Sequence, residues 1–291
     1  MAEGEFTFEG VTWGGDTRFV VTKSAANMGD VRVEDADNAY GDGVLVGRDS
    51  LGAGSMSWEV TTDADHFEDP AGTNALDLWE DLAAAWRVAV REQIPGKLYP
   101  LSYTALGRRR RIYGRPRRQD IPSSGDILAM QGQAAGAIEF MLAEPYTYGE
   151  DEQSITIDRI TTGTGGVTIP TQIPFVVGVT PGARNGSLHI DGRAPTPLLV
   201  KFHGPVIDPY LRGPGLDISL RGKIDPGMVV TVDTRQKTID RGLTNVRGAL
   251  VRGSSLGARL NPGTHQLTYG GSDATNSSFV TVSWRPAYYS I

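Results

Sequence analysis

The stretch AIEFMLAEPYTYGEDEQ, residues 137–153, decides how this chain is organised. It begins with Ile138, Phe140 and Leu142, which alternate with other residues at the period of a half-buried β-strand. The strand then runs into an acidic residue, a proline and two tyrosines within residues 144–148. We therefore expect an apolar strand that ends at this motif.

A polar run, Glu150 to Gln153, follows that strand, and we interpret it as a linker. The sequence therefore predicts two domains, residues 1–149 and residues 150–291. A chain of 291 residues is long for one core and comfortable for two. Its 37 glycines and 17 prolines are spread between short apolar runs, which favours many short strands joined by tight turns.

The first domain is predicted to be rich in strands and to carry one helix packed on a sheet. Three further segments alternate like half-buried strands, and they contain Phe6 and Phe8, Val31 and Val33, and Met56, Trp58 and Val60. Residues 75–91 instead carry apolar side chains, Trp79 and Trp86 among them, at helical steps of three and four. Thr73 or Asn74 can cap this helix, and Pro95-Gly96 ends it.

The second domain is predicted to consist of strands alone. Alternating apolar runs recur between turn signals such as Asp225-Pro226-Gly227 and Asn261-Pro262-Gly263. These runs include Leu188 and Ile190, Leu198, Val200 and Phe202, Leu216, Ile218 and Leu220, and Val280, Val282 and Trp284. A series of short strands without a helix indicates a β-sandwich or jelly roll.

The sequence offers no usable catalytic or metal-binding constellation, so we expect no enzyme activity, no cofactor and no metal. The chain has no cysteine, and its four histidines, His66, His189, His203 and His265, have no metal-site spacing. Gly253 to Gly257 spells G-x-S-x-G around Ser255, but that motif needs a strand–turn–helix context. Gly163 to Gly166 lacks the lysine of a phosphate loop and is interpreted as a hairpin loop.

Neither a secretory signal nor an apolar run near the roughly 18 residues of a spanning helix is present, so we expect synthesis in a cytoplasm and no membrane insertion.

Charge is distributed unevenly along the chain. Residues 1–100 hold 19 acidic and 7 basic side chains, whereas residues 101–118 hold no acid and seven arginines. The seven are Arg108, Arg109, Arg110, Arg111, Arg115, Arg117 and Arg118. Arginine suits bidentate pairing with carboxylates, and the acidic first hundred residues can supply the partners. We therefore favour pairing within the chain, between subunits or with a channel, and we leave phosphate binding, with Tyr113 stacking on a base, as the alternative.

The second domain can also be interpreted as a sugar-binding module. Stacking on sugar rings would need exposed aromatic side chains, and the candidates are Tyr210, Tyr269, Tyr288 and Tyr289. Trp284 is a weaker candidate, because it lies in an alternating strand and is expected in the core. A carbohydrate-binding adhesin that contacts the host cell surface is therefore the alternative function.

The order of these features resembles that of the distal tail (Dit-like) proteins of long-tailed, non-contractile phages, and the minor tail proteins of phages that infect actinobacteria. The resemblance rests on the strand from Phe140 that ends in an acidic-Pro-x-x-aromatic motif at Tyr148. It continues in a second domain similar to the family's galectin-like half, through Asn185-Gly186, Pro195 and Pro197, residues 216–220, Val232-Asp233-Thr234 and residues 260–267.

The resemblance implies a structural virion protein at the tail tip that forms a homohexameric ring around the DNA channel. In that arrangement the first domain forms the ring, between the tail tube protein and the tail-associated hub or baseplate protein. The galectin-like sandwich projects outward, where it can meet host cell-wall glycan. The family carries no catalytic residues, and none is transferred to this chain. No sequence-specific nucleic-acid partner is implied, and the arginine run matches no motif of the family.

Overall fold

The computed structural model describes residues 2–62, 75–122, 133–158 and 184–289. The chain divides into two compact units, one made of Met1–Glu150 with Tyr288–Ile291 and the other of Asp151–Ala287. Each unit has its own hydrophobic core. The expected helix cap at Thr73 or Asn74, the hairpin loop at 163–166 and His66 lie outside the described residues.

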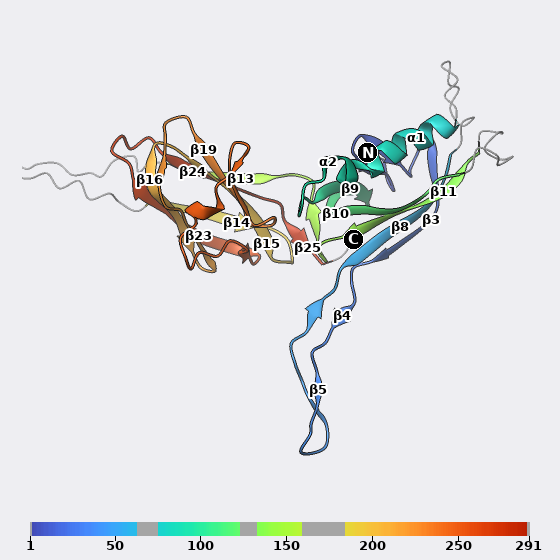
Figure 1. Cartoon of the computed structure of the whole chain (residues 1–291), viewed down its shortest axis with the longest axis horizontal. Helices are drawn as coiled ribbons and strands as arrows, with labels where there is room; N and C mark the ends of the chain where they lie inside the picture. The colour runs from blue at the N-terminus through green and yellow to red at the C-terminus, as the bar shows by residue number, and fades with distance from the viewer. Residues whose placement is uncertain (1, 63–74, 123–132, 159–183, 290–291) are drawn as a thin grey trace, which may run out of the picture. The chain divides into compact units, whose positions relative to one another are not determined.

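The first unit is built on one antiparallel sheet of nine strands (Figure 1). In chain order these are β1 (Phe6–Phe8), β2 (Val11–Trp13), β3 (Phe19–Asn27), β8 (Gly54–Thr62), β9 (Tyr99–Ala105), β10 (Arg108–Asp120), β11 (Ala135–Leu142), β12 (Thr147–Gly149) and β25 (Ala287–Tyr288). The spatial order is β2-β1-β9-β10-β11-β8-β3, and β12 pairs with both β10 and β25. The strand predicted at residues 137–143 is confirmed as β11, which ends at Leu142 before the Glu144-Pro145 turn.

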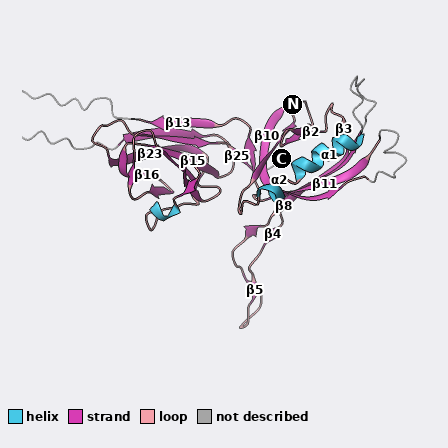
Figure 2. Ribbon diagram, turned by 45° about the horizontal axis from the view of Figure 1, so that its top comes forward, coloured by secondary structure: helices cyan, strands magenta, loops and turns pink. Residues whose placement is uncertain are grey.

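Two short helices, α1 (Ala75–Trp86) and α2 (Val88–Glu92), replace the single helix predicted over residues 75–91. The interruption lies at Arg87, whose φ of −90° and ψ of 5° fall in the bridge region between helix and extended backbone. Both tryptophans of the predicted stripe are buried, and each indole N–H donates to a backbone carbonyl, Trp79 to Ala134 at 3.2 Å and Trp86 to Arg118 at 3.1 Å. The helices therefore pack on the sheet as expected (Figure 2).

Aromatic rings fill the space between this sheet and α1. Trp86 meets Phe8, Trp13 and Phe140 edge to face, with ring centroids 5.4, 5.7 and 6.2 Å apart. Such geometry adds about 0.5–1.5 kcal/mol per pair beyond the apolar area that it buries. These rings come from β1, β2, β11 and α1, so the aromatic cluster ties together segments far apart in the sequence.

Between β3 and β8 the chain extends beyond the sheet as a long hairpin, residues 28–53, which we call the arm (Figure 1). It contains β4 (Val31–Arg32), β5 (Ala36–Asp37), β6 (Val44–Leu45) and β7 (Ser50–Leu51), paired as β4-β7 and β5-β6. The expectation of a half-buried strand at Val31 and Val33 is wrong, because these side chains are 59% and 60% exposed. Their alternation is present, but neither hydrophobic core of the described residues includes them.

The second unit is a β-sandwich with one core between two antiparallel sheets. One sheet runs β13-β24-β15-β19-β20-β21, with β22 beside β15, and the other runs β14-β23-β16-β17, with β18 beside β16. The bounds are β13 (Gln153–Ile157), β14 (Arg184–Ile190), β15 (Thr196–His203), β16 (Val206–Gly213), β17 (Leu216–Ser219), β18 (Lys223–Ile224), β19 (Val229–Asp233), β20 (Thr238–Arg241), β21 (Thr244–Asn245), β22 (Arg259–Leu260), β23 (Gly263–Ser272) and β24 (Phe279–Trp284). A short 3-10 helix, η1 (Arg247–Ala249), lies between β21 and β22.

The alternating runs of the second unit are confirmed as inward-facing core positions. Val200 on β15 and Val282 on β24 are directly paired and completely buried. The turn predicted at Asp225-Pro226-Gly227 also forms, since the Met228 N–H donates to the Asp225 carbonyl at 3.0 Å and Gly227 has a φ of +75°. The strand from Phe279 to Trp284 stays with the sandwich, whereas the residues from Tyr288 onward belong to the first unit.

Candidate functional site

The arginine run forms most of β10, in the first unit's sheet. Ile112, Gly114 and Pro116 alternate along it as buried positions. Gly114 is required there, because a Cβ would lie 1.9 Å from the Met141 carbonyl oxygen on β11. The arginines occupy most of the remaining positions of β10, and their surroundings divide them into those with a partner in the first unit and those without one.

Arg111 is the most deeply engaged member of the run. Its Nε and Nη2 donate to the two oxygens of Glu150 at 3.2 and 2.5 Å, and Ser102 Oγ donates to the same carboxylate at 3.0 Å. The register Arg111↔Tyr148 between β10 and β12 brings the pair together. The partner therefore comes from the polar run that follows β12, and not from the acidic first hundred residues.

Arg115, Arg117 and Arg118 also have partners within the first unit. Arg115 donates to the carbonyls of Lys97 and Ile94 at 2.8 and 2.9 Å, which ties the segment after α2 to the sheet. The Arg117 guanidinium contacts the Met141 sulfur, and Arg118 pairs with Asp120. The Arg118 and Asp120 side chains are both largely exposed, so we assign that pair little stabilising effect.

Among the first three arginines, Arg110 differs from Arg108 and Arg109. Arg110 lies over the ring of Tyr288, with its guanidinium carbon 3.6 Å from the ring centroid. Arg108 and Arg109 are exposed, and neither has a hydrogen bond or ion pair with the residues that the structure describes. They follow the turn at Leu106-Gly107, where Leu106 is 91% exposed. The arginines of the run that have no partner in the described residues are thus confined to the β9–β10 hairpin turn.

The four candidate tyrosines for glycan contact differ in their surroundings and belong to both units. Tyr269 is completely buried, because it follows Leu267 by two residues on β23 and therefore faces the same core, so its expected exposure is wrong. Tyr210, on β16, carries the Arg212 guanidinium at 4.6 Å. Tyr288 is covered by Arg110, and Tyr289 is 56% exposed beside Tyr146. Trp284 is buried, as expected.

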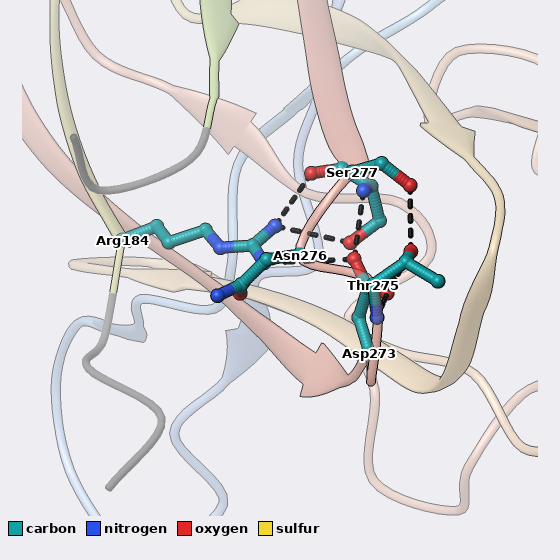
Figure 3. A network of polar contacts seen from close by, with 6 residues as sticks. Arg184, Asp273, Thr275, Asn276 and Ser277 are labelled. Carbon is teal, nitrogen blue, oxygen red and sulfur yellow. Dashed lines mark hydrogen bonds and ion pairs between the residues drawn. The ribbon is translucent and has the colours of Figure 1, made fainter. Parts of the chain in front are cut away.

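A network of polar contacts lies at the β23–β24 turn of the sandwich (Figure 3). Asp273 accepts hydrogen bonds from the backbone N–H groups of Thr275 and Ser278 at 2.9 and 2.7 Å, and from the Thr275 hydroxyl at 2.7 Å. Burial opposes ionisation, but these hydrogen bonds prevail and hold the pKa of Asp273 well below its usual range.

Arg184 completes the network from β14. It donates to the Ser278 carbonyl and hydroxyl at 2.6 and 3.0 Å and to the Asn276 side chain at 3.2 Å, while lying 3.8 Å from Asp273. The hydrogen-bond and ion-pair partners of this buried arginine, Ser278, Asn276 and Asp273, lie within the turn, so we interpret the network as a structural clamp on the loop (Figure 3).

Residues considered for catalysis and metal binding have structural partners instead. Ser255 Oγ accepts from the Asp217 N–H at 2.8 Å and donates to the Asp217 carbonyl at 3.1 Å, which fastens its loop to β17. His189 and His203 lie on strands of different sheets, and burial lowers the pKa of His203. The described residues contain no cluster of three acidic or histidine side chains that could hold a metal ion, and none of their helices is long and apolar enough to span a membrane.

Comparison with known proteins gives matches at the level of structure alone. No family model matches the sequence, and no curated protein does. Among solved structures, the chain is similar to the SPP1 Dit protein, described as a paradigm of the hub adsorption apparatus in phages that infect Gram-positive bacteria. That match covers 97% of this chain and 98% of the other, with 13% identity and a TM-score of 0.57.

Chains of the phage P2 baseplate in its activated conformation are also similar. The structure with Ca matches at 10% identity and a TM-score of 0.51, over 96% of this chain and 97% of the other, and the structure with Sr matches at 11% and 0.51, over 96% of each chain. Because these matches run through both units, the chain has the mainly β, two-unit fold of a Dit-like phage tail protein.

Proposed function

We propose that this chain is a structural subunit of a phage tail tip that assembles into a homohexameric ring. The observation that carries the proposal is the match to SPP1 Dit over 97% of the chain, which includes both units and not one common sandwich alone. Each polar cluster described above fastens elements of the fold together, so we infer that the function of this subunit depends on its exposed surfaces. A ring built by head-to-tail contacts needs two different complementary surfaces on each subunit.

In this proposal the first unit forms the ring around the DNA channel. It corresponds to the first domain predicted from the sequence, residues 1–149. One face of the ring meets the tail tube protein and the other meets the tail-associated hub or baseplate protein. The second unit is the galectin-like sandwich that projects outward. Support for the first unit as the ring former comes from its unpaired features, the arm and the exposed Arg108 and Arg109.

The test is the assembly state of the purified full chain and its place in the virion. Sedimentation velocity at low and high salt should give a species near six times the 31.2 kDa chain mass, and negative-stain images should show closed rings. Antibody labelling should mark the tail tip of intact particles. A chain that stays monomeric at all concentrations, alone and with the tail tube protein, and that is absent from purified particles would rule the proposal out.

A further inference from the structure

The arm, residues 28–53, presents a strongly acidic surface. It carries six carboxylates and two arginines, Arg32 and Arg48, in 26 residues. The carboxylates are Asp30, Glu34, Asp35, Asp37, Asp42 and Asp49. Within the part of the chain that the structure describes, no ion pair joins an arm carboxylate to an arginine. Among the six carboxylates, only that of Asp35 accepts a hydrogen bond there, from the backbone N–H of Gly47 at 2.8 Å.

The arm also exposes apolar side chains along its whole length. At its end Tyr40 is 102% exposed, in a turn closed by the Asn38 N–H donating to the Gly43 carbonyl at 3.1 Å. Further toward the sheet the exposed side chains are Val31, Val33, Val44, Leu45, Val46 and Leu51. Exposed apolar residues grouped on one element, beside charged ones, mark an interaction surface. A protruding tyrosine is a frequent centre of such a contact.

The arm is a weak structure when it has no partner. Its two ladders, β4-β7 and β5-β6, each contain two residues per strand, and no third strand from the described residues pairs with either. An isolated two-stranded hairpin is at best marginally stable in water. A surface that covers the apolar side chains of the arm would therefore stabilise it. The alternation at Val31 and Val33 is explained if that surface belongs to another molecule.

A complementary surface exists elsewhere on the same chain. The β9–β10 turn carries exposed Leu106 followed by Arg108 and Arg109, the two arginines of the run that have no hydrogen bond, ion pair or ring contact with the described residues. We propose that the arm of one copy docks on the Leu106–Arg109 turn of a second copy, with its carboxylates facing these two arginines. The inference rests on the proposed self-assembly and names the contact that produces it. A second copy is the fitting occupant because acidic and basic partners lie on separate parts of one chain, as head-to-tail association requires.

Charge exchange tests the contact. Glu34→Lys with Asp37→Lys, and separately Arg108→Glu with Arg109→Glu, should each weaken self-association about tenfold or more at low salt. Combining the four substitutions in one chain should restore most of the affinity. As a matched control, Glu80→Lys with Asp81→Lys changes two exposed carboxylates on α1 and should leave assembly unchanged.

A crosslink tests the location directly, because the chain has no native cysteine. Protein carrying Val44→Cys, mixed with protein carrying Leu106→Cys and oxidised, should give a disulfide-linked dimer. Val44→Cys mixed with Leu243→Cys, an exposed position of the second unit, should give far less. If the native chain assembles while the first mixture shows no excess crosslink and the charge reversals have no effect, the docking inference is wrong and the ring proposal stands. If the native chain never self-associates, both fail.

Discussion

At the scale of single residues, the arginine run is mostly a set of internal fastenings. Arg111 and Glu150 illustrate this, because two hydrogen bonds join them and both side chains are partly buried. Removing one member of such a pair leaves the other without its charged partner, which costs more than the pair itself contributes. The role of Arg111 is therefore stability of the first unit, whereas Arg108 and Arg109 remain available for partners.

We expect Glu150→Gln to destabilise the first unit by about 1–2 kcal/mol. Tryptophan fluorescence during urea unfolding measures this, since four of the five tryptophans, Trp13, Trp58, Trp79 and Trp86, lie in the first unit. Glu59→Gln is the matched control, because Glu59 pairs with Lys23 at the exposed surface and should unfold like the native chain. Equal midpoints for the two variants would contradict a structural role for Arg111.

The Asp273 clamp gives a prediction that depends on pH. The pKa of Asp273 is lowered in the folded state, so its stabilising effect is complete above the usual aspartate value of 3.8 and is lost as the pH falls toward the lowered value. Asp273→Asn should therefore cost about 1–3 kcal/mol at pH 7 and clearly less at pH 3. Hydrogen exchange of peptides from β23 and β24, corrected for intrinsic rates, measures the difference.

Asp225→Asn serves as the control for this measurement, since Asp225 pairs with Lys223 at the exposed surface. It should leave exchange in β23 and β24 unchanged at either pH. A pH-independent effect of Asp273→Asn would mean that the carboxylate charge is not what holds the loop.

At the scale of elements, the base of the arm depends on glycine. Gly29 has a φ of +99°, and a Cβ there would lie 2.4 Å from the Gly52 carbonyl oxygen. Gly29→Ala should push the two strands of the arm apart at Gly29 and Gly52 and speed proteolytic cleavage of the arm several-fold. The urea unfolding curve measured by tryptophan fluorescence should stay unchanged. Gly43→Ala is the control, because its φ of +97° imposes the same backbone strain but its Cβ would meet nothing within 4 Å. Equal cleavage rates for the two variants would show that the close approach at Gly29 is unimportant.

Elements were predictable from the sequence wherever burial decides the pattern. The alternations in β8, β11, β15 and β24 face a core within the same chain, so a local rule finds them. The same rule fails at Val31 and Val33. An alternating pattern indicates that one face of a strand is covered, but it does not indicate which molecule covers that face. The break at Arg87 was missed too, since one apolar stripe runs through both helices.

The site was predictable in composition but not in pairing. Seven arginines in one segment indicate carboxylate partners, yet Glu150 becomes the partner of Arg111 through the register of β12 on β10, which charge counts cannot reveal. The position of Tyr269 was accessible in principle, because it shares the face of Leu267 two residues earlier.

At the scale of the whole molecule, the first unit is assembled from two separate pieces of chain, residues 1–150 and the residues from Tyr288 onward. Tyr288 belongs to β25, which pairs with β12, and its ring lies under the Arg110 guanidinium at 3.6 Å. A cation–π contact of this kind contributes about 0.5–2 kcal/mol. The end of the chain is therefore part of the folding unit with which the chain begins.

We accordingly expect Tyr288→Ala to lower the urea midpoint of the first unit, as tryptophan fluorescence reports it, although the substitution lies beyond the entire second unit in sequence. Tyr210→Ala is the matched control, since Tyr210 also stacks with an arginine, Arg212 at 4.6 Å, but belongs to the second unit. A fragment that ends at Glu150 should resemble Tyr288→Ala or be less stable, because it lacks the whole returning segment. If that fragment unfolds at the midpoint of the native chain, the returning residues add nothing to the stability of the first unit.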